Sequence, residues 1–156
     1  MMEIEARASG DRHKSVEQWL KAADLRRKQL GDIGAAIAAL EEVLRVDPSR
    51  EDAFQSLQEI YTGQSRLPEL FQLLLNRAKR IDDREEKRKM LLRAAELAFN
   101  RMQDPELAVR AHREVLACDP SFVRSYRIIA EIMEAKNRWR EALEAYDGVI
   151  RNKIGR

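Results

Sequence analysis

Apolar residues recur at spacings of three and four along almost the whole chain, and short polar breaks interrupt them. This spacing puts apolar side chains on one side of a helix, so the chain is predicted to be helical nearly throughout. The breaks contain Gly, Asp or Pro, which end or cap helices. Eight helices, forming four antiparallel hairpins, are expected at about 14–30, 33–46, 50–62, 67–80, 84–101, 105–119, 121–135 and 138–151.

One segment of the chain is repeated. Residues 31–49 return at 103–121, an offset of 72 residues, and nine of the nineteen positions are identical. The identical pairs are Asp32/Asp104, Ala36/Ala108, Ala39/Ala111, Glu42/Glu114, Val43/Val115, Leu44/Leu116, Asp47/Asp119, Pro48/Pro120 and Ser49/Ser121. Two hairpins therefore form one 72-residue superrepeat, and half of it lies close to a period of about 34 residues.

These residues resemble the tetratricopeptide repeat (TPR) family, whose pattern is W-x2-L-G-x2-Y, then A-x3-F-x2-A, then P. The best match is Gly31-Asp32-x3-Ala36-Ile37-x2-Leu40-x2-Val43-x3-Asp47-Pro48. The Trp position of the four repeats holds Trp19, Phe54, Leu91 and Tyr126. Repeat two departs from the pattern at Gln58 and Leu70, and repeats one and three have a first helix one residue longer. The chain also looks like the diverged TPR arrays of large bacterial proteins.

The resemblance implies an all-α, right-handed α-solenoid of four TPR-like hairpins. We expect residues 1–12 to be a disordered leader and residues 13–156 to form a single repeat domain. The repeats would cover about 14–48, 49–82, 83–120 and 121–156. A single hairpin cannot bury its apolar side alone, so stacked hairpins share one core. In the first helix, Trp19, Ala22, Ala23 and Leu25 are predicted to share the buried side.

Composition limits the functions that the chain can have. It is 44% hydrophobic and 36% charged with a net charge of +2, a balance that does not by itself predict nucleic-acid binding. A single cysteine, Cys118, allows no intrachain disulfide and no cysteine-based zinc site, and core packing is its expected role. There is neither a membrane-length apolar run nor a signal-peptide core, so a cytoplasmic protein is expected. No cofactor, metal or catalytic set is predicted.

The resemblance places part of each repeat's first helix towards a concave groove that binds a peptide or partner helix. The residues predicted to line this groove are Lys21, Asp24, Gln55, Glu59, Lys89, Arg93, Glu96, Arg124, Arg127 and Glu131. They would form a mixed-charge surface for a peptide that carries both signs. The alternative is a solvated helix face, stabilised by pairs worth ~0.2–0.5 kcal/mol each.

Two further features bear on partners. Chaperone-binding TPR domains clamp a terminal carboxylate, and Lys89 and Arg93 match two residues of that clamp. The other positions hold Leu20, Asp24 and Ser56, so no binding of chaperone C-terminal peptides is expected. His112 stands where a large apolar residue is expected and is predicted to be a packed histidine rather than a ligand.

The last helix leaves an apolar face that needs a cover, because the ends of a repeat array require a polar cap. An end-to-end contact with another copy, or with further repeats, is expected at Trp139, Leu143, Tyr146, Val149 and Ile150.

The favoured function is a non-enzymatic scaffold for protein–protein interaction. The second interpretation is a regulatory or sensory segment of a larger protein, such as a kinase or transcription factor. The third is an RNA-binding helical repeat, because residues 77–93 hold eight Lys or Arg against four Asp or Glu. That stretch lacks the interleaved aromatic residues on which bases stack.

Overall fold

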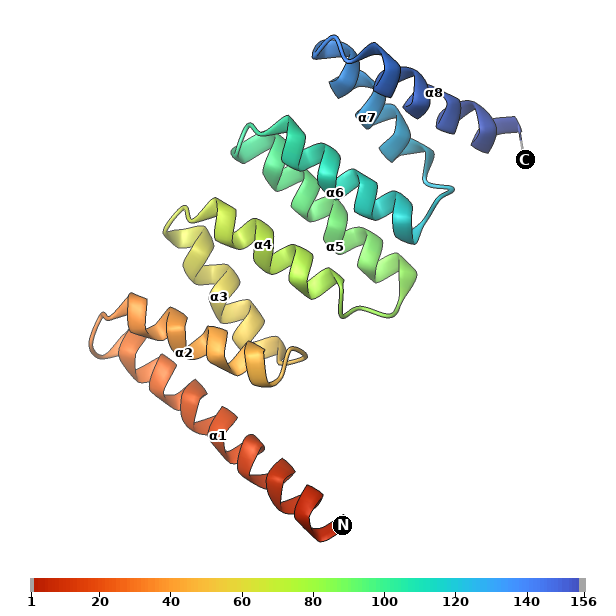
Figure 1. Cartoon of the computed structure of the whole chain (residues 1–156). Helices are drawn as coiled ribbons and strands as arrows, with labels where there is room; N and C mark the ends of the chain where they lie inside the picture. Colours follow the sequence, from red (N-terminus) through yellow and green to blue (C-terminus); the bar gives the residue numbers. More distant parts are fainter. Residues whose placement is uncertain (1, 155–156) are drawn as a thin grey trace. The chain divides into compact units, whose positions relative to one another are not determined.

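A computed structural model describes the backbone of residues 2–154 and the side chains of residues 10–153. Regular structure in this part of the chain is entirely helical, which confirms the all-α prediction. The helices are α1 (Met2–Lys28), α2 (Ile33–Val46), α3 (Glu51–Gly63), α4 (Leu67–Ala78), α5 (Arg84–Glu96), η1 (Leu97–Arg101), α6 (Pro105–Cys118), α7 (Val123–Ala135) and α8 (Trp139–Ile154) (Figure 1).

The structure divides into two compact units, and a single repeat domain over residues 13–156 stays a prediction. Unit 1 is Met1–Arg66 and unit 2 is Leu67–Arg156. Within the units, α1 pairs with α2, α5 with α6, and α7 with α8 (Figure 1). These paired helices make the protein an all-helical repeat of the kind found in α-solenoids.

In unit 1, α1 begins at Met2 instead of near Lys14, so residues 2–12 extend the helix where a disordered leader was expected. Residues 3–8 contain no proline and consist of Glu, Ile, Ala and Arg, most of which favour helix. Gly10 is the one weak position, and glycine costs only about 1 kcal/mol in a helix interior. The helix therefore continues upstream without a break.

The buried side of α1 is narrower than predicted. Val16 and Ala23 are buried, whereas Trp19 and Leu25 are exposed, against expectation. Within unit 1 the main packing partner of α1 is α2, so only the α1 residues that face α2 lose contact with water. The buried residues of α2, which packs against both α1 and α3, are all apolar: Ala36, Ile37, Ala39, Leu40 and Val43.

Two kinds of turn recur 72 residues apart, at the same offset as the repeat in the sequence. Ser65 and Asn137 both have a left-handed backbone, with φ of 55° and 59°. The residue after each one donates its amide to the carbonyl five residues back, at 2.8 Å in both turns.

Asp47 and Asp119 each accept a hydrogen bond from the serine two residues on, at 2.6 and 2.7 Å. The repeated Asp-Pro-Ser segment is thus a helix-ending turn.

In unit 2, the helix predicted over residues 84–101 changes character near its end. α5 stops at Glu96 and the π-turn η1 follows, in which Met102 N donates to Leu97 O at 3.0 Å. The first helix of this repeat was expected to be one residue longer than the TPR pattern, and this single π-turn is wider than an α-helical turn.

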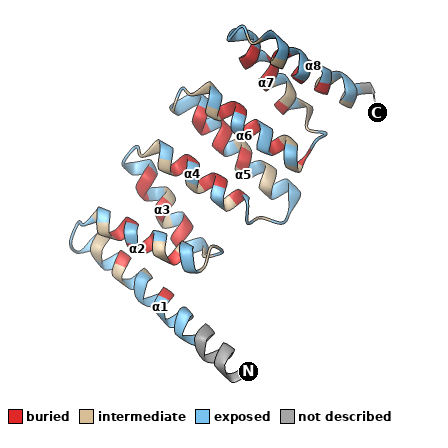
Figure 2. Ribbon diagram, viewed as in Figure 1, coloured by how far each residue is buried: buried red, intermediate tan, exposed pale blue. Residues whose placement is uncertain are grey.

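The core of unit 2 lies between its helices, where α6 packs against both α5 and α7 (Figure 2). Its buried side chains include Leu74, Leu91, Val115, Ile129 and Met133. α8 packs against α7 and approaches it closely at Gly148, where an added Cβ would overlap the ring of Tyr126.

Candidate functional site

A pocket of about 490 Å³ lies between α5 and α7 in unit 2, and α6 completes its lining. The apolar lining residues are Leu92, Ala95, Phe99, Pro105, Ile128, Ile132 and Ala135. The polar and charged ones are Glu96, Asn100, His112, Arg124, Glu131 and Lys136. Its size falls within the range of about 300–1,000 Å³ that is usual for ligand pockets.

Helical periodicity explains why these side chains gather. Residues 92, 95, 96 and 99 share one side of the α5 and η1 segment, and residues 124, 128, 131, 132 and 135 share one side of α7. The π-turn carries Phe99 at the pocket, and its side chain is 52% exposed. π-turns inserted in α-helices are frequent at functional sites.

His112 is the buried polar group of the pocket. It is only 6% exposed, and its Nδ1 lies 2.9 Å from the Oγ of the fully buried Ser125. Burial, and secondarily the charge of Arg124, lowers the pKa of His112 from 6.5 to about 4. The imidazole is therefore neutral at pH 7, as a packed histidine should be.

Three charged groups of the pocket remain available. Among the described residues, Glu96, Arg124 and Glu131 have no hydrogen bond or ion pair. Lys136, by contrast, donates to Glu106 at 2.7 Å. The pocket therefore combines an apolar interior with two carboxylates and one guanidinium that a ligand can engage.

The ten residues predicted for the groove do not all come together. Glu96, Arg124 and Glu131 line the pocket, whereas Lys89 pairs with Glu85 at 2.9 Å along its own helix. The remaining two in unit 2, Arg93 and Arg127, are exposed on α5 and α7 outside the pocket lining. A groove that includes them stays a prediction.

In unit 1 the predicted groove residues form local pairs. Asp24 pairs with Lys28 at 2.9 Å, Gln55 donates to Glu51 at 3.0 Å, and Glu59 accepts from Arg27 of α1 at 3.3 Å. Lys21 is exposed. The first two of these pairs are i,i+4 contacts, as expected of a solvated helix face, whereas the third joins α3 to α1. A second hollow in this unit is lined by Asp11, Arg12, Ser15, Trp19, Glu42, Arg45 and Val46, and so by none of the predicted groove residues.

The predicted end-contact residues form an apolar face on α8. Three of them are well exposed, at 57% for Trp139, 64% for Leu143 and 52% for Ile150. Tyr146 is 36% exposed and Val149 is half-buried. Tyr146 Oη also donates to Glu134 Oε2 at 2.9 Å. Contact of this face with another copy stays a prediction.

The pocket contains residues that the sequence pattern did not single out, chiefly Phe99 and Ile128. Phe99 is displayed by the π-turn, which the extra residue of repeat three does not by itself predict, because repeat one has the same extra residue and α1 is α-helical. Ile128 looks like any core residue of an amphipathic helix. His112 was correctly predicted to be packed, but its place in a pocket was not foreseen.

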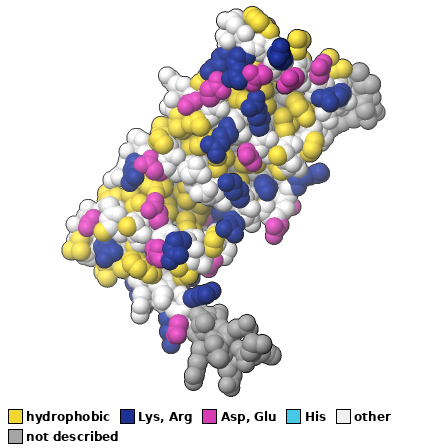
Figure 3. All heavy atoms as spheres, viewed as in Figure 1, with side chains coloured by type: hydrophobic (Ala, Val, Ile, Leu, Met, Phe, Trp, Pro, Cys, Tyr) yellow, Lys and Arg dark blue, Asp and Glu magenta, His cyan; other side chains and the backbone are white. Residues whose placement is uncertain are grey.

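The described residues contain no group of His, Cys, Asp and Glu side chains arranged to hold a metal ion. Nor, over the same part of the chain, is any helix both long and apolar enough to cross a membrane. Charged side chains of both signs lie among hydrophobic ones on the face drawn in Figure 3. Cys118 is half-buried, and burial raises the pKa of its thiol.

No protein-family model matches the chain, and no curated protein matches it. Several solved structures are similar. One described as "MamA MSR-1 C2" is 18% identical over 89% of this chain and 77% of that one, with a TM-score of 0.48. Two others, "Crystal structure of MamA" and "Crystal structure of MamA protein", are 20% and 19% identical, cover 85% and 91% of this chain and 95% and 93% of those, and both have a TM-score of 0.37. At these values the likeness carries no argument about function.

Proposed function

We propose that this helical repeat, a TPR-like module, is a non-enzymatic scaffold that binds a segment of a partner protein at the pocket between α5 and α7. One observation supports this most directly. The pocket is apolar inside, and its Glu96, Arg124 and Glu131 make no hydrogen bond or ion pair with any described residue. Such a combination of apolar walls and a few convergent polar groups is typical of binding sites.

Photo-crosslinking tests the proposal. A benzophenone amino acid at Phe99, which is exposed and lines the pocket, should crosslink to a partner protein in an extract of the source cells. The same amino acid at Glu114, an exposed residue of α6 outside the pocket lining, is the control and should not give that product.

The crosslink should also depend on the pocket itself. Ala135→Trp places a large side chain at an exposed lining position, and Glu131→Arg reverses one of the available charges. Both should abolish the product, whereas Glu144→Arg, an equal charge change on α8, should leave it intact. Equal crosslinking by all three variants would rule the pocket out as the binding site.

A further inference from the structure

The hydrogen bond between Ser125 and His112 fixes the position of the imidazole proton. Ser125 is fully buried, and among the described residues its hydroxyl has no hydrogen-bond partner except His112 Nδ1. A buried hydroxyl that donates to nothing costs ~1–3 kcal/mol. The hydroxyl therefore donates to Nδ1, and the single proton of the neutral ring is on Nε2.

His112 Nε2 reaches the pocket. It makes no hydrogen bond to any described residue, yet no buried side-chain nitrogen or oxygen in the described part of the chain lacks a partner. Nε2 therefore keeps contact with solvent, and the pocket is the cavity that His112 lines. The pocket thus presents an N–H donor beside its apolar walls.

The walls and the donor together select one kind of side chain. Leu92, Ala95 and Ile128 form apolar walls that suit an aromatic ring. The N–H donor of His112 favours a ring that carries a hydrogen-bond acceptor at its far end. Phenylalanine and leucine carry no acceptor, and tryptophan offers only a donor. Tyrosine meets both needs, since its phenol oxygen accepts a hydrogen bond.

The charged groups indicate what accompanies the ring. Glu96 lies on α5 and Glu131 on α7, and neither has a partner among the described residues. With Arg124 as the one available cation, the free charges of the pocket sum to −1. A basic residue next to the ring is therefore favoured.

We infer that the pocket takes a tyrosine side chain from the partner segment, with its phenol oxygen accepting a hydrogen bond from His112 Nε2 and a neighbouring Lys or Arg pairing with Glu96 or Glu131. This inference rests on the proposed function and specifies its ligand.

Selection from a random peptide display library on the full chain tests the inference. Peptides that lose binding to Ala135→Trp should share a tyrosine next to Lys or Arg. Replacing that tyrosine with phenylalanine should weaken binding roughly 5- to 100-fold, the effect of leaving one buried donor unpaired. On His112→Phe the two peptides should bind equally, and Glu114→Arg should behave as wild type. Circular dichroism checks that each variant is folded.

Each outcome decides a different point. Pocket-dependent peptides without tyrosine would overturn this inference and leave the proposed function standing. A phenylalanine peptide that binds as tightly as the tyrosine peptide would overturn the hydrogen bond. Failure to select any pocket-dependent peptide would overturn both proposals. Independently, ¹⁵N chemical shifts of His112 at pH 7 should show the Nε2–H tautomer, and an Nδ1–H tautomer would contradict the inference.

Discussion

Gly31 and Gln103 occupy the same left-handed position, 72 residues apart, with φ of 63° and 52°. The aspartate after each donates its amide to the carbonyl six residues back, Asp32 to Arg26 at 3.0 Å and Asp104 to Ala98 at 2.9 Å. Both helices thus end at a residue with a left-handed backbone, a position that is usually glycine. Glutamine makes the same turn at a steric cost of roughly 1–2 kcal/mol, because its Cβ crowds the next carbonyl.

Gln103→Gly should therefore stabilise the protein by about 1 kcal/mol, measured as the free energy of unfolding in urea. Gly31→Gln should destabilise it by a similar amount. Gln64→Gly is the matched control, because Gln64 follows α3 with a φ of −94° and gains nothing from glycine. A Gln103→Gly protein no more stable than wild type would show that the turn at η1 is not strained.

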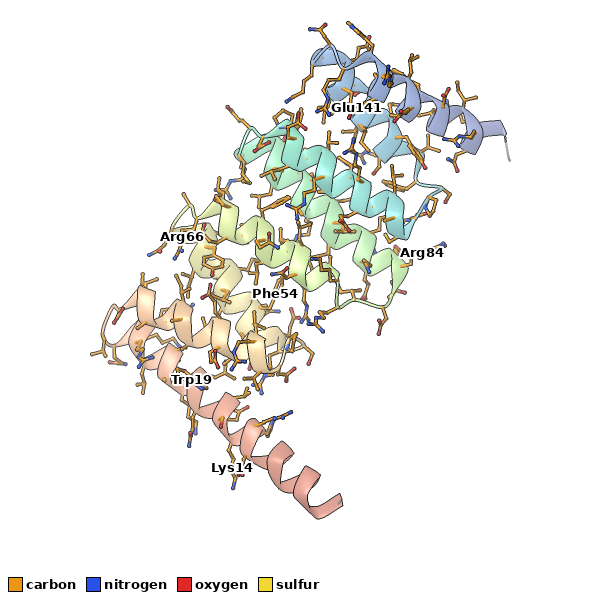
Figure 4. The ribbon with its side chains drawn as sticks, viewed as in Figure 1. Lys14, Trp19, Phe54, Arg66, Arg84 and Glu141 are labelled. Carbon is orange, nitrogen blue, oxygen red and sulfur yellow. The ribbon has the colours of Figure 1, made fainter. Side chains whose placement is uncertain are left out.

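The helices and their breaks were predictable because they depend on local residue order. The range predicted for the second helix, 33–46, is that of α2, and the Gly31 and Asp47 breaks lie where expected. The exposure of Trp19 was not predictable, because it depends on which neighbour covers α1 rather than on the spacing of apolar residues (Trp19 and the buried Phe54 are labelled in Figure 4).

The site was predictable only in part for the same reason. The TPR resemblance identified Glu96, Arg124 and Glu131 as residues on one side of their helices, and the pocket contains them. Two features of the site depend on packing between helices, which the spacing of residues in the sequence does not predict. They are the π-turn that displays Phe99 and the hydrogen bond that orients His112.

The repeated Asp-Pro-Ser turn is held by different partners in the two units. In unit 2, Arg88 donates to the nearly buried Asp119 at 2.6 Å and lies over the ring of Phe122. The position equivalent to Arg88 in the first superrepeat is Val16, and there Arg50 of the turn donates instead to Glu17 of α1 at 2.9 Å.

Arg88→Met should lower the free energy of unfolding by about 1–3 kcal/mol, because it leaves the Asp119 carboxylate buried without its charge partner. Arg84→Met is the control, since Arg84 (Figure 4) lies one turn earlier on α5 and is exposed. Equal unfolding midpoints for the two variants would mean that the pair adds nothing to stability.

Asp119 also makes a pH-dependent contribution. Its hydrogen bond from Ser121, followed by the one from Arg88, lowers the pKa of its carboxyl. The folded state therefore binds this proton less readily, so the stabilisation is present above the unfolded pKa and is lost as pH falls through the folded one. The free energy of unfolding of Arg88→Met should therefore fall less than that of wild type when the pH is lowered into the acid range.

His112 should make folding pH-dependent in a higher range. Its pKa falls from 6.5 in the unfolded chain to about 4 in the folded one. Between these values the unfolded chain binds more protons, so this contribution is full above about pH 6.5 and declines towards pH 4. We expect the free energy of unfolding to be about 2 kcal/mol lower at pH 5 than at pH 7 from this group alone.

Double substitution of the buried pair, His112→Leu with Ser125→Ala, should remove that part of the pH dependence. His13→Ala removes the other histidine, which is exposed, and should leave the dependence unchanged. A pH profile that is the same in wild type and in the double variant would show that His112 ionises normally in the folded state.

Gly148 allows α8 to lie against α7, because a Cβ at this position would overlap the ring of Tyr126. Gly148→Ala should therefore destabilise the protein by about 1–3 kcal/mol, although alanine favours helix, since overpacking outweighs the gain in propensity. Gly34→Ala in α2 is the control: its nearest neighbour would be Asp32 Oδ1 at 3.8 Å, so it should be neutral or stabilising. In a double-mutant cycle, Gly148→Ala should cost little once Tyr126→Ala has removed the ring. Independent, additive effects of the two substitutions would show that this contact does not set the distance between the helices.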